Sequence, residues 1–206
     1  MIRFLQISLL SLFVISCKSY HIENAVREEL TIKEYKNLYF SNPKTDYIYK
    51  ATIEIYGNQL SGLFIAKRLN NTSHRVVFTT DFGNTLLDFE LSENDFKINY
   101  IQEDLNRKII VNTLRDDFRL LLKVNNPVQE IFENDESIIY KSADKKRFNY
   151  FYVNKSDKQL TKIVSASKAK EKIIIGFEAK KVIFAENISI QHKNIKLKII
   201  LNQISN

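Results

Sequence analysis

A strict alternation of apolar and polar residues constrains this chain more than any other feature of its sequence. In the stretch YIYKATIEIY, residues 47–56, the odd-numbered positions are all apolar, while Lys50, Thr52 and Glu54 are polar. Successive side chains of a β-strand point to opposite faces, so a period of two is typical of a strand that is buried on one side. The stretch therefore predicts a half-buried strand.

The residues that follow repeat this pattern between short polar turns. Gly57 and Asn58 supply the first turn, and the sequence DFGN at residues 81–84 supplies a later one. The apolar segments between the turns read QLSGLFIAK, HRVVFTT, TLLDFEL and FKINYI. Five strands joined by such turns predict an antiparallel meander.

The alternation stops in the segment EDLNRKIIVNTLRDDFRLLLK, which contains neither Gly nor Pro. At 100° per residue, Ile110, Leu114, Phe118 and Leu121 lie on one broad apolar face, and a second apolar stripe lies nearly opposite. A helix that is apolar on two sides is usually embedded in a protein. We therefore predict an embedded helix over about residues 103–123.

Strand patterns resume after this helix in SIIYKSA, RFNYFYVN, QLTKIVSAS, KIIIGFEA and the closing KVIFAENISIQHKNIKLKIILNQIS. The chain is rich in β-branched residues, Phe and Tyr, a composition that favours strands. About ten strands and one helix predict an α+β fold that is mostly β. We place it in a single domain over residues 47–206, which is long enough to bury a sizeable core.

Residues 17–46 are polar and only weakly periodic. The sequence ENAVREELTIKEYKNLYF is compatible with a helix and equally with a flexible tether that lifts the domain from a membrane. Pro43 and its polar neighbours indicate the boundary with the domain.

The N-terminal sequence predicts export. After Arg3, an apolar run of about a dozen residues ends at the stretch FVISCKSY, which holds the only cysteine. A membrane-spanning helix needs about twenty residues, so this run has the length of a secretory signal. The residues Val14, Ile15, Ser16 and Cys17 resemble the lipobox of bacterial lipoproteins.

The lipobox resemblance implies that residues 1–16 are a signal peptide and that Cys17 receives a diacylglyceryl group. Two or three acyl chains give a stable membrane anchor. An ordinary signal peptide with an incidental cysteine is the alternative. Lys18 stands where such lipoproteins carry an inner-membrane retention Asp, which implies an outer-membrane anchor facing the periplasm, with the cell surface left open. The composition fits an AT-rich genome such as that of Bacteroidota.

The net charge of +7 would suggest nucleic acid as a partner if the protein were cytosolic. Because the chain is predicted to be exported, we expect no nucleic-acid partner. Anionic lipid headgroups and the phosphates of lipopolysaccharide are candidate partners instead. A solvated surface without a specific anion partner is the alternative. The oligomeric state is not indicated by the sequence.

No pattern for catalysis or for a cofactor is evident. The sequence contains neither G-x-S-x-G nor a Walker A or G-x-G-x-x-G motif, and DFG lacks the companion motifs of kinases. The pair Asp116–Asp117 reads as the polar edge of the helix, with Arg115 and Arg119 as its ion partners. The histidines are isolated in sequence, so we predict no metal site, no cofactor and no enzyme; they are His21, His74 and His192.

The stretch IYGNQLSGLFIAK…HRVVFTTDFGNTLLDFEL and the closing ENISIQHKNIKLKIIL resemble the lipoprotein carrier and receptor (LolA/LolB-like) superfamily in pattern, although the Trp positions usual in that superfamily are absent. The resemblance implies an incomplete antiparallel β-barrel that is closed by helices and holds acyl chains in an apolar cavity. The candidate cavity residues are Ile53, Phe64, Phe78, Ile110, Leu114, Phe118 and Leu121.

A fold of this kind is compatible with two functions. A curved sheet with a movable helix would bind acyl chains of lipids or lipoproteins through the apolar area that is removed from water. Alternatively, a closed barrel around the helix would serve as a scaffold or protein-interaction lipoprotein of the cell envelope, with no ligand cavity.

Overall fold

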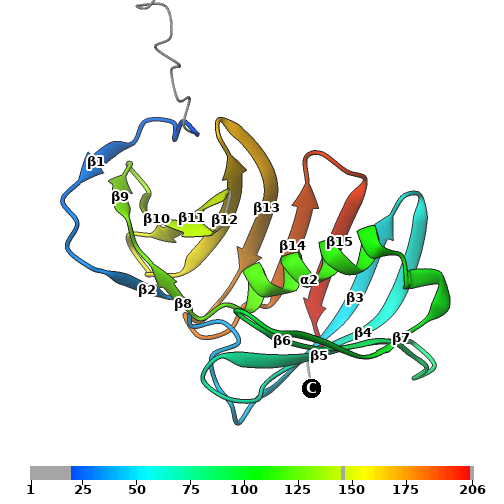
Figure 1. Cartoon of the computed structure of the whole chain (residues 1–206). Coiled ribbons are helices and arrows are strands. Elements are labelled where there is room, and N and C mark those ends of the chain that lie inside the picture. The colour runs from blue at the N-terminus through cyan, green and yellow to red at the C-terminus, as the bar shows by residue number, and fades with distance from the viewer. Residues whose placement is uncertain (1–19, 145–146, 205–206) are drawn as a thin grey trace, which may run out of the picture.

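The structure is built on one long antiparallel sheet that curves around helix α2 (Figure 1). The computed structural model describes residues 20–144 and 147–204. In this part of the chain, thirteen strands form the sheet in the order β1-β9-β10-β11-β12-β13-β14-β15-β3-β4-β5-β6-β7, and β2 pairs separately with β8.

The strands are β1 (Val26–Glu28), β2 (Glu34–Lys36), β3 (Asp46–Ile55), β4 (Asn58–Arg68), β5 (Ser73–Thr80), β6 (Thr85–Ser92), β7 (Phe96–Ile101), β8 (Asn125–Pro127), β9 (Glu130–Glu133), β10 (Ser137–Asp144), β11 (Arg147–Asn154), β12 (Leu160–Ser167), β13 (Lys170–Glu178), β14 (Asn187–His192) and β15 (Leu197–Gln203). The helical segments are the 3-10 turn η1 (Glu103–Leu105) and α2 (Lys108–Leu122).

The sheet is open, because its edge strands β1 and β7 do not pair with each other in the described structure. The predicted fold class, a mostly β incomplete barrel around an embedded helix, is confirmed. The strands that the sequence pattern did not predict, β1, β2, β8 and β9, have three or four residues each. Strands of that length are too short to display an alternation.

The segment before β3 differs from both expectations, a helix and a flexible tether. From Tyr20 onward it carries β1 and β2, and it buries Tyr39 and Phe40, each only 1% exposed. The Tyr39 hydroxyl donates a hydrogen bond of 3.1 Å to the backbone oxygen of Leu160. The segment is therefore part of the folded domain, because its aromatic side chains complete the core.

The helix begins and ends inside the predicted range of 103–123. Gln102 precedes η1, and α2 proper starts after Arg107 and ends at Leu122. No helix in the described part of the chain is long and apolar enough to span a membrane.

Two hydrophobic clusters lie on opposite faces of the sheet. The main cluster contains the apolar face of α2 and the inward side chains of β3–β6 and β11–β15. The second lies on the outer face of β10–β13, where Ile22 packs against Ile139, Tyr150 and Val164. Residues 20–25 thus cover the outer face of β10–β13.

Candidate functional site

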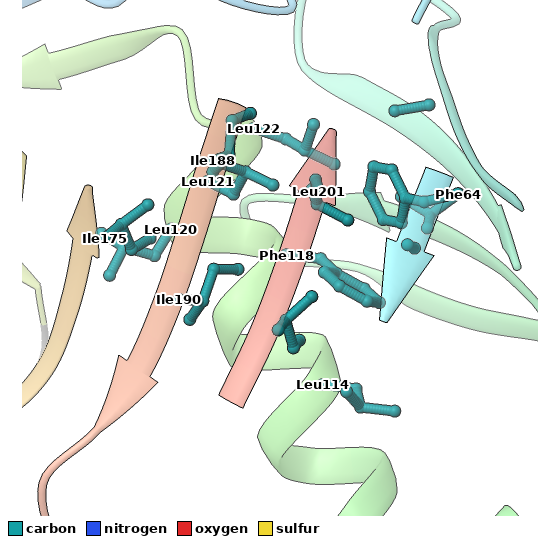
Figure 2. Close-up of a cluster of buried hydrophobic side chains, with 14 of the residues drawn as sticks. Phe64, Leu114, Phe118, Leu120, Leu121, Leu122, Ile175, Ile188, Ile190 and Leu201 are labelled. Carbon is teal, nitrogen blue, oxygen red and sulfur yellow. The ribbon is translucent and has the colours of Figure 1, made fainter. Parts of the chain in front are cut away.

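Helix α2 occupies the concave face of the sheet. Phe118 and Leu121 are fully buried, and the ring centroid of Phe118 lies 5.3 Å from that of Phe64 on β4. Figure 2 shows these helix side chains among Ile190 of β14 and Leu201 of β15. The apolar face of the helix is therefore satisfied by the sheet itself.

All seven candidate cavity residues belong to this main cluster, and each is at most 6% exposed: Ile53, Phe64, Phe78, Ile110, Leu114, Phe118 and Leu121. None of them lines either of the two cavities described below. A ligand could reach these side chains only if α2 moved away from the sheet.

The larger cavity, of about 640 Å³, lies along the C-terminal half of α2, between the helix, strands β10–β13 and the neighbouring ends of β5 and β6. Its apolar lining consists of Leu91, Leu120, Leu122, Val124, Ala143 and Ile173. A volume of this size lies within the range of small-molecule sites, about 300–1,000 Å³. The cavity can therefore hold part of an apolar chain.

Polar groups line the same cavity opposite the helix. Asn149 of β11 and Ser165 of β12 are 6% and 2% exposed, and neither side chain has a hydrogen-bond partner among the described residues. Arg147 also lines the cavity and makes no ion pair with any residue that the structure describes. Buried polar groups usually have a hydrogen-bond partner. Because these three side chains have none among the described residues, their polar atoms are available to the polar end of a ligand.

Arg119 is one of two cations on the helix side of the larger cavity, the other being Lys123. Its guanidinium donates hydrogen bonds to the backbone oxygens of Ser92, at 2.9 Å, and Asp95, at 2.8 Å. Partial burial lowers the pKa of Arg119, and the neighbouring charge of Arg115 lowers it further. Arg119 therefore fixes the turn between β6 and β7 against α2 and is less available to a ligand than Arg147.

The smaller cavity, of about 490 Å³, lies toward the N-terminal end of α2 and shares Asp116, Arg147 and Ile173 with the larger one. At its wall, Nε2 of His192 lies 2.9 and 2.8 Å from the two carboxylate oxygens of Asp117. The Asp117 side chain is fully buried. The pair fastens α2 to β14.

Burial raises the pKa of Asp117, while the hydrogen bond from His192 and the charge of His192 oppose that rise. The expected polar edge at Asp116–Asp117 was correct for Asp116, which pairs with Arg115 at 2.8 Å. It was wrong for Asp117, whose partner is His192 and not an arginine. The reason is that position 117 lies on the side of α2 that faces the sheet.

The residues that sequence reasoning missed come from distant strands. His192 was noted only as an isolated histidine, and Arg147, Asn149 and Ser165 were not singled out. Asn149 and Ser165 could have been recognised in the sequence, because they are polar residues at inward positions of otherwise apolar strands. Cys17 lies outside the described residues, and the DFG tripeptide lies in the turn between β5 and β6.

In the described ranges, no group of three or more His, Cys, Asp and Glu side chains is placed to hold a metal ion.

No family model matches the chain, and no curated protein matches it. Among solved structures, the chain is similar to the crystal structure of a LolA superfamily protein from Nitrosomonas europaea, with a TM-score of 0.51 and 9% identity over 82% of this chain and 88% of that chain. A putative outer membrane lipoprotein-sorting protein domain from Vibrio parahaemolyticus gives a TM-score of 0.43 and 9% identity over 78% and 83% of the two chains. The first likeness shows that the fold is of the LolA type.

Proposed function

We propose that this chain is a non-enzymatic lipoprotein of the bacterial outer membrane that binds acyl chains of lipids or lipoproteins beside α2. The observation that carries the proposal is the cavity of about 640 Å³ between α2 and β10–β13, on the concave side of a LolA-type sheet. Acylation of Cys17 would anchor the domain, which would face the periplasm.

The lining of the larger cavity suits an amphiphile. Leu120, Leu122 and Ile173 offer apolar surface, and each methylene buried there contributes about 0.8 kcal/mol. Arg147 is the available cation for a carboxylate or phosphate head group, because a guanidinium binds such groups through two parallel hydrogen bonds. A long chain would extend from the cavity under α2, toward Phe118 and Leu121, once the helix shifts.

A scaffold or protein-interaction lipoprotein is the second candidate function. It is favoured by the tight packing of α2, whose Leu114, Phe118 and Leu121 are at most 2% exposed. On this alternative, the helix would be a permanent part of the core and the domain would present only its surface to partners.

We expect the Arg147→Glu variant to bind a fluorescent long-chain fatty acid at least about tenfold more weakly than the unmodified sequence. A charge-assisted hydrogen bond contributes about 1.5–3 kcal/mol, and each 1.4 kcal/mol is tenfold. Binding of the matching fatty alcohol, which has no anionic head group, should be unchanged. Both affinities are measured by fluorescence titration of a chain that starts at Lys18 and so lacks the anchor.

Lys44→Glu is the matched control, because Lys44 is exposed, does not line the cavity and forms no ion pair among the described residues. It should leave both affinities unchanged. If neither probe binds and native mass spectrometry finds no co-purified lipid, the acyl-binding proposal fails. Recovery of a stable protein partner by pull-down would then favour the scaffold.

A further inference from the structure

Three hairpin turns meet at one end of the sheet. They connect β12 with β13, β14 with β15 and β3 with β4, and they point the same way along the upper edge of Figure 1. Backbone hydrogen bonds tie them together: the Lys193 N–H donates to the Lys172 oxygen, and the Tyr56 N–H donates to the Lys196 oxygen, both at 2.9 Å. We call this surface the basic rim; it consists of Tyr56, Lys168, Lys170, Lys193 and Lys196.

The rim concentrates unneutralised positive charge. Its four lysines are exposed, and none of them forms an ion pair with a residue that the structure describes. Tyr56 is 48% exposed and adds an amphipathic ring. The three turns contain no acidic residue. The turns at the opposite end of the sheet carry six acidic residues and four lysines, a net charge of −2: Glu93, Asp95, Asp135, Glu136, Asp157 and Glu186, and Lys155, Lys158, Lys180 and Lys181. The two ends of the sheet therefore differ in charge.

The described chain starts beside this rim. The Tyr20 hydroxyl donates a hydrogen bond of 3.0 Å to Glu171, the residue after Lys170, and the Tyr20 ring centroid lies 4.9 Å from that of Tyr150. In Figure 1 the blue start of the described chain lies near the turn between β12 and β13. Cys17 precedes Tyr20 by three residues, which can span at most about 11 Å.

We propose that the basic rim is the surface by which the domain rests on an anionic phospholipid membrane. The inference deepens the proposed function, because it rests on acylation of Cys17. An anchor within about 11 Å of Tyr20 holds the rim close to the lipid headgroups and leaves no length for a spacer. Lysines next to an anionic surface attract it, and tyrosine is enriched at the membrane–water interface. The acidic turns at the opposite end then face away.

The orientation is tested with the acylated full chain in vesicles of phosphatidylcholine mixed with phosphatidylglycerol. Acylation consumes the thiol of the only cysteine, so an introduced cysteine is the single site for a fluorophore. The dye is placed by Lys193→Cys at the rim or by Lys181→Cys in the turn between β13 and β14. We expect nitroxide-labelled lipid to quench the rim dye at least about fivefold more strongly. Equal quenching, or stronger quenching at position 181, would overturn the proposal.

The charge contribution is tested with the chain that starts at Lys18, since both hydrophobic clusters consist of residues after that position. Each lysine near an anionic surface contributes about fivefold to membrane partitioning. Replacing the four rim lysines by glutamine should lower binding to the anionic vesicles by about a hundredfold or more. The control removes the same charge at exposed positions elsewhere, Lys44, Lys158, Lys180 and Lys181, and should retain most of the binding.

Equal losses in the two variants would overturn recognition by the rim. Failure of the premise is separately visible, because mass spectrometry of the protein purified from membranes would then show no diacylglyceryl group on Cys17. Binding of the acyl probe in the larger cavity is a third, independent measurement. The four rim lysines do not line that cavity, so loss of probe binding would count against the proposed acyl-binding function and not against the rim.

Discussion

The His192→Ala variant should lose about 3–5 kcal/mol of unfolding free energy at neutral pH. The substitution leaves the carboxylate of Asp117 fully buried between α2 and β14 without its hydrogen-bond partner. An unpaired buried charge is among the costliest defects in a protein, and removing one member of a buried pair costs about this much. Urea unfolding followed by circular dichroism measures the change.

The loss in His192→Ala should grow with pH. Burial raises the pKa of Asp117, so its protonated form stabilises the fold at low pH, and that contribution disappears as pH rises through the folded-state pKa. In the chain that retains His192, the hydrogen bond and the charge of His192 oppose this rise in the pKa of Asp117. Without His192, the penalty should be smallest near pH 4, the ordinary pKa of aspartate, and should increase above it.

A double-mutant cycle separates the pair from its surroundings. Adding Asp117→Ala to His192→Ala removes the unpaired charge, so the double variant should be more stable than the sum of the two single losses predicts, by at least about 1 kcal/mol. His21→Ala, at an exposed histidine, should have no effect. Strict additivity, or a loss in His192→Ala that is independent of pH, would contradict an electrostatic role of the pair.

The alternation of apolar residues was sufficient to predict most of the sheet. Strand β3 shows why: its pattern of exposed and buried residues alternates almost without exception from Asp46 to Ile55. The helix was predictable for the same reason, because Ile110, Leu114 and Phe118 share one face. In both cases the information is local, and one segment of sequence contains it.

The contacts that form the candidate site could not be predicted from a local sequence pattern. Asp117 meets His192 across 75 positions of sequence, and Arg147 of β11 lines the smaller cavity together with residues of the helix. These contacts depend on how strongly the sheet curves, which no local pattern records. The same holds for Tyr39 and Phe40, whose burial depends on a core that forms from strands far along the chain.

The close approach of β4 and β5 at Gly62 is a further consequence of that curvature. A Cβ atom at Gly62 would lie 1.7 Å from the backbone oxygen of Thr79 and 3.0 Å from the Cα of Thr80. The register between β5 and β6 shifts between Phe78 and Thr79, at the same place. Backbone atoms cannot rotate away as a side chain can, so a methyl group at Gly62 must separate the strands.

We therefore expect Gly62→Ala to cost at least about 3 kcal/mol, at the upper end of the range for overpacked sites. Gly176→Ala is the matched control in the same sheet, because its Cβ would meet only the side-chain Oγ of Ser189, at 2.9 Å, and a serine can change rotamer. That variant should shift the urea midpoint little, since alanine also restricts the unfolded chain. Equal midpoints for the two variants would show that β5 can move away from β4 at no cost. Because Phe64 follows on β4 and contacts Phe118, Gly62→Ala should also weaken the packing of α2 and increase binding of apolar dyes.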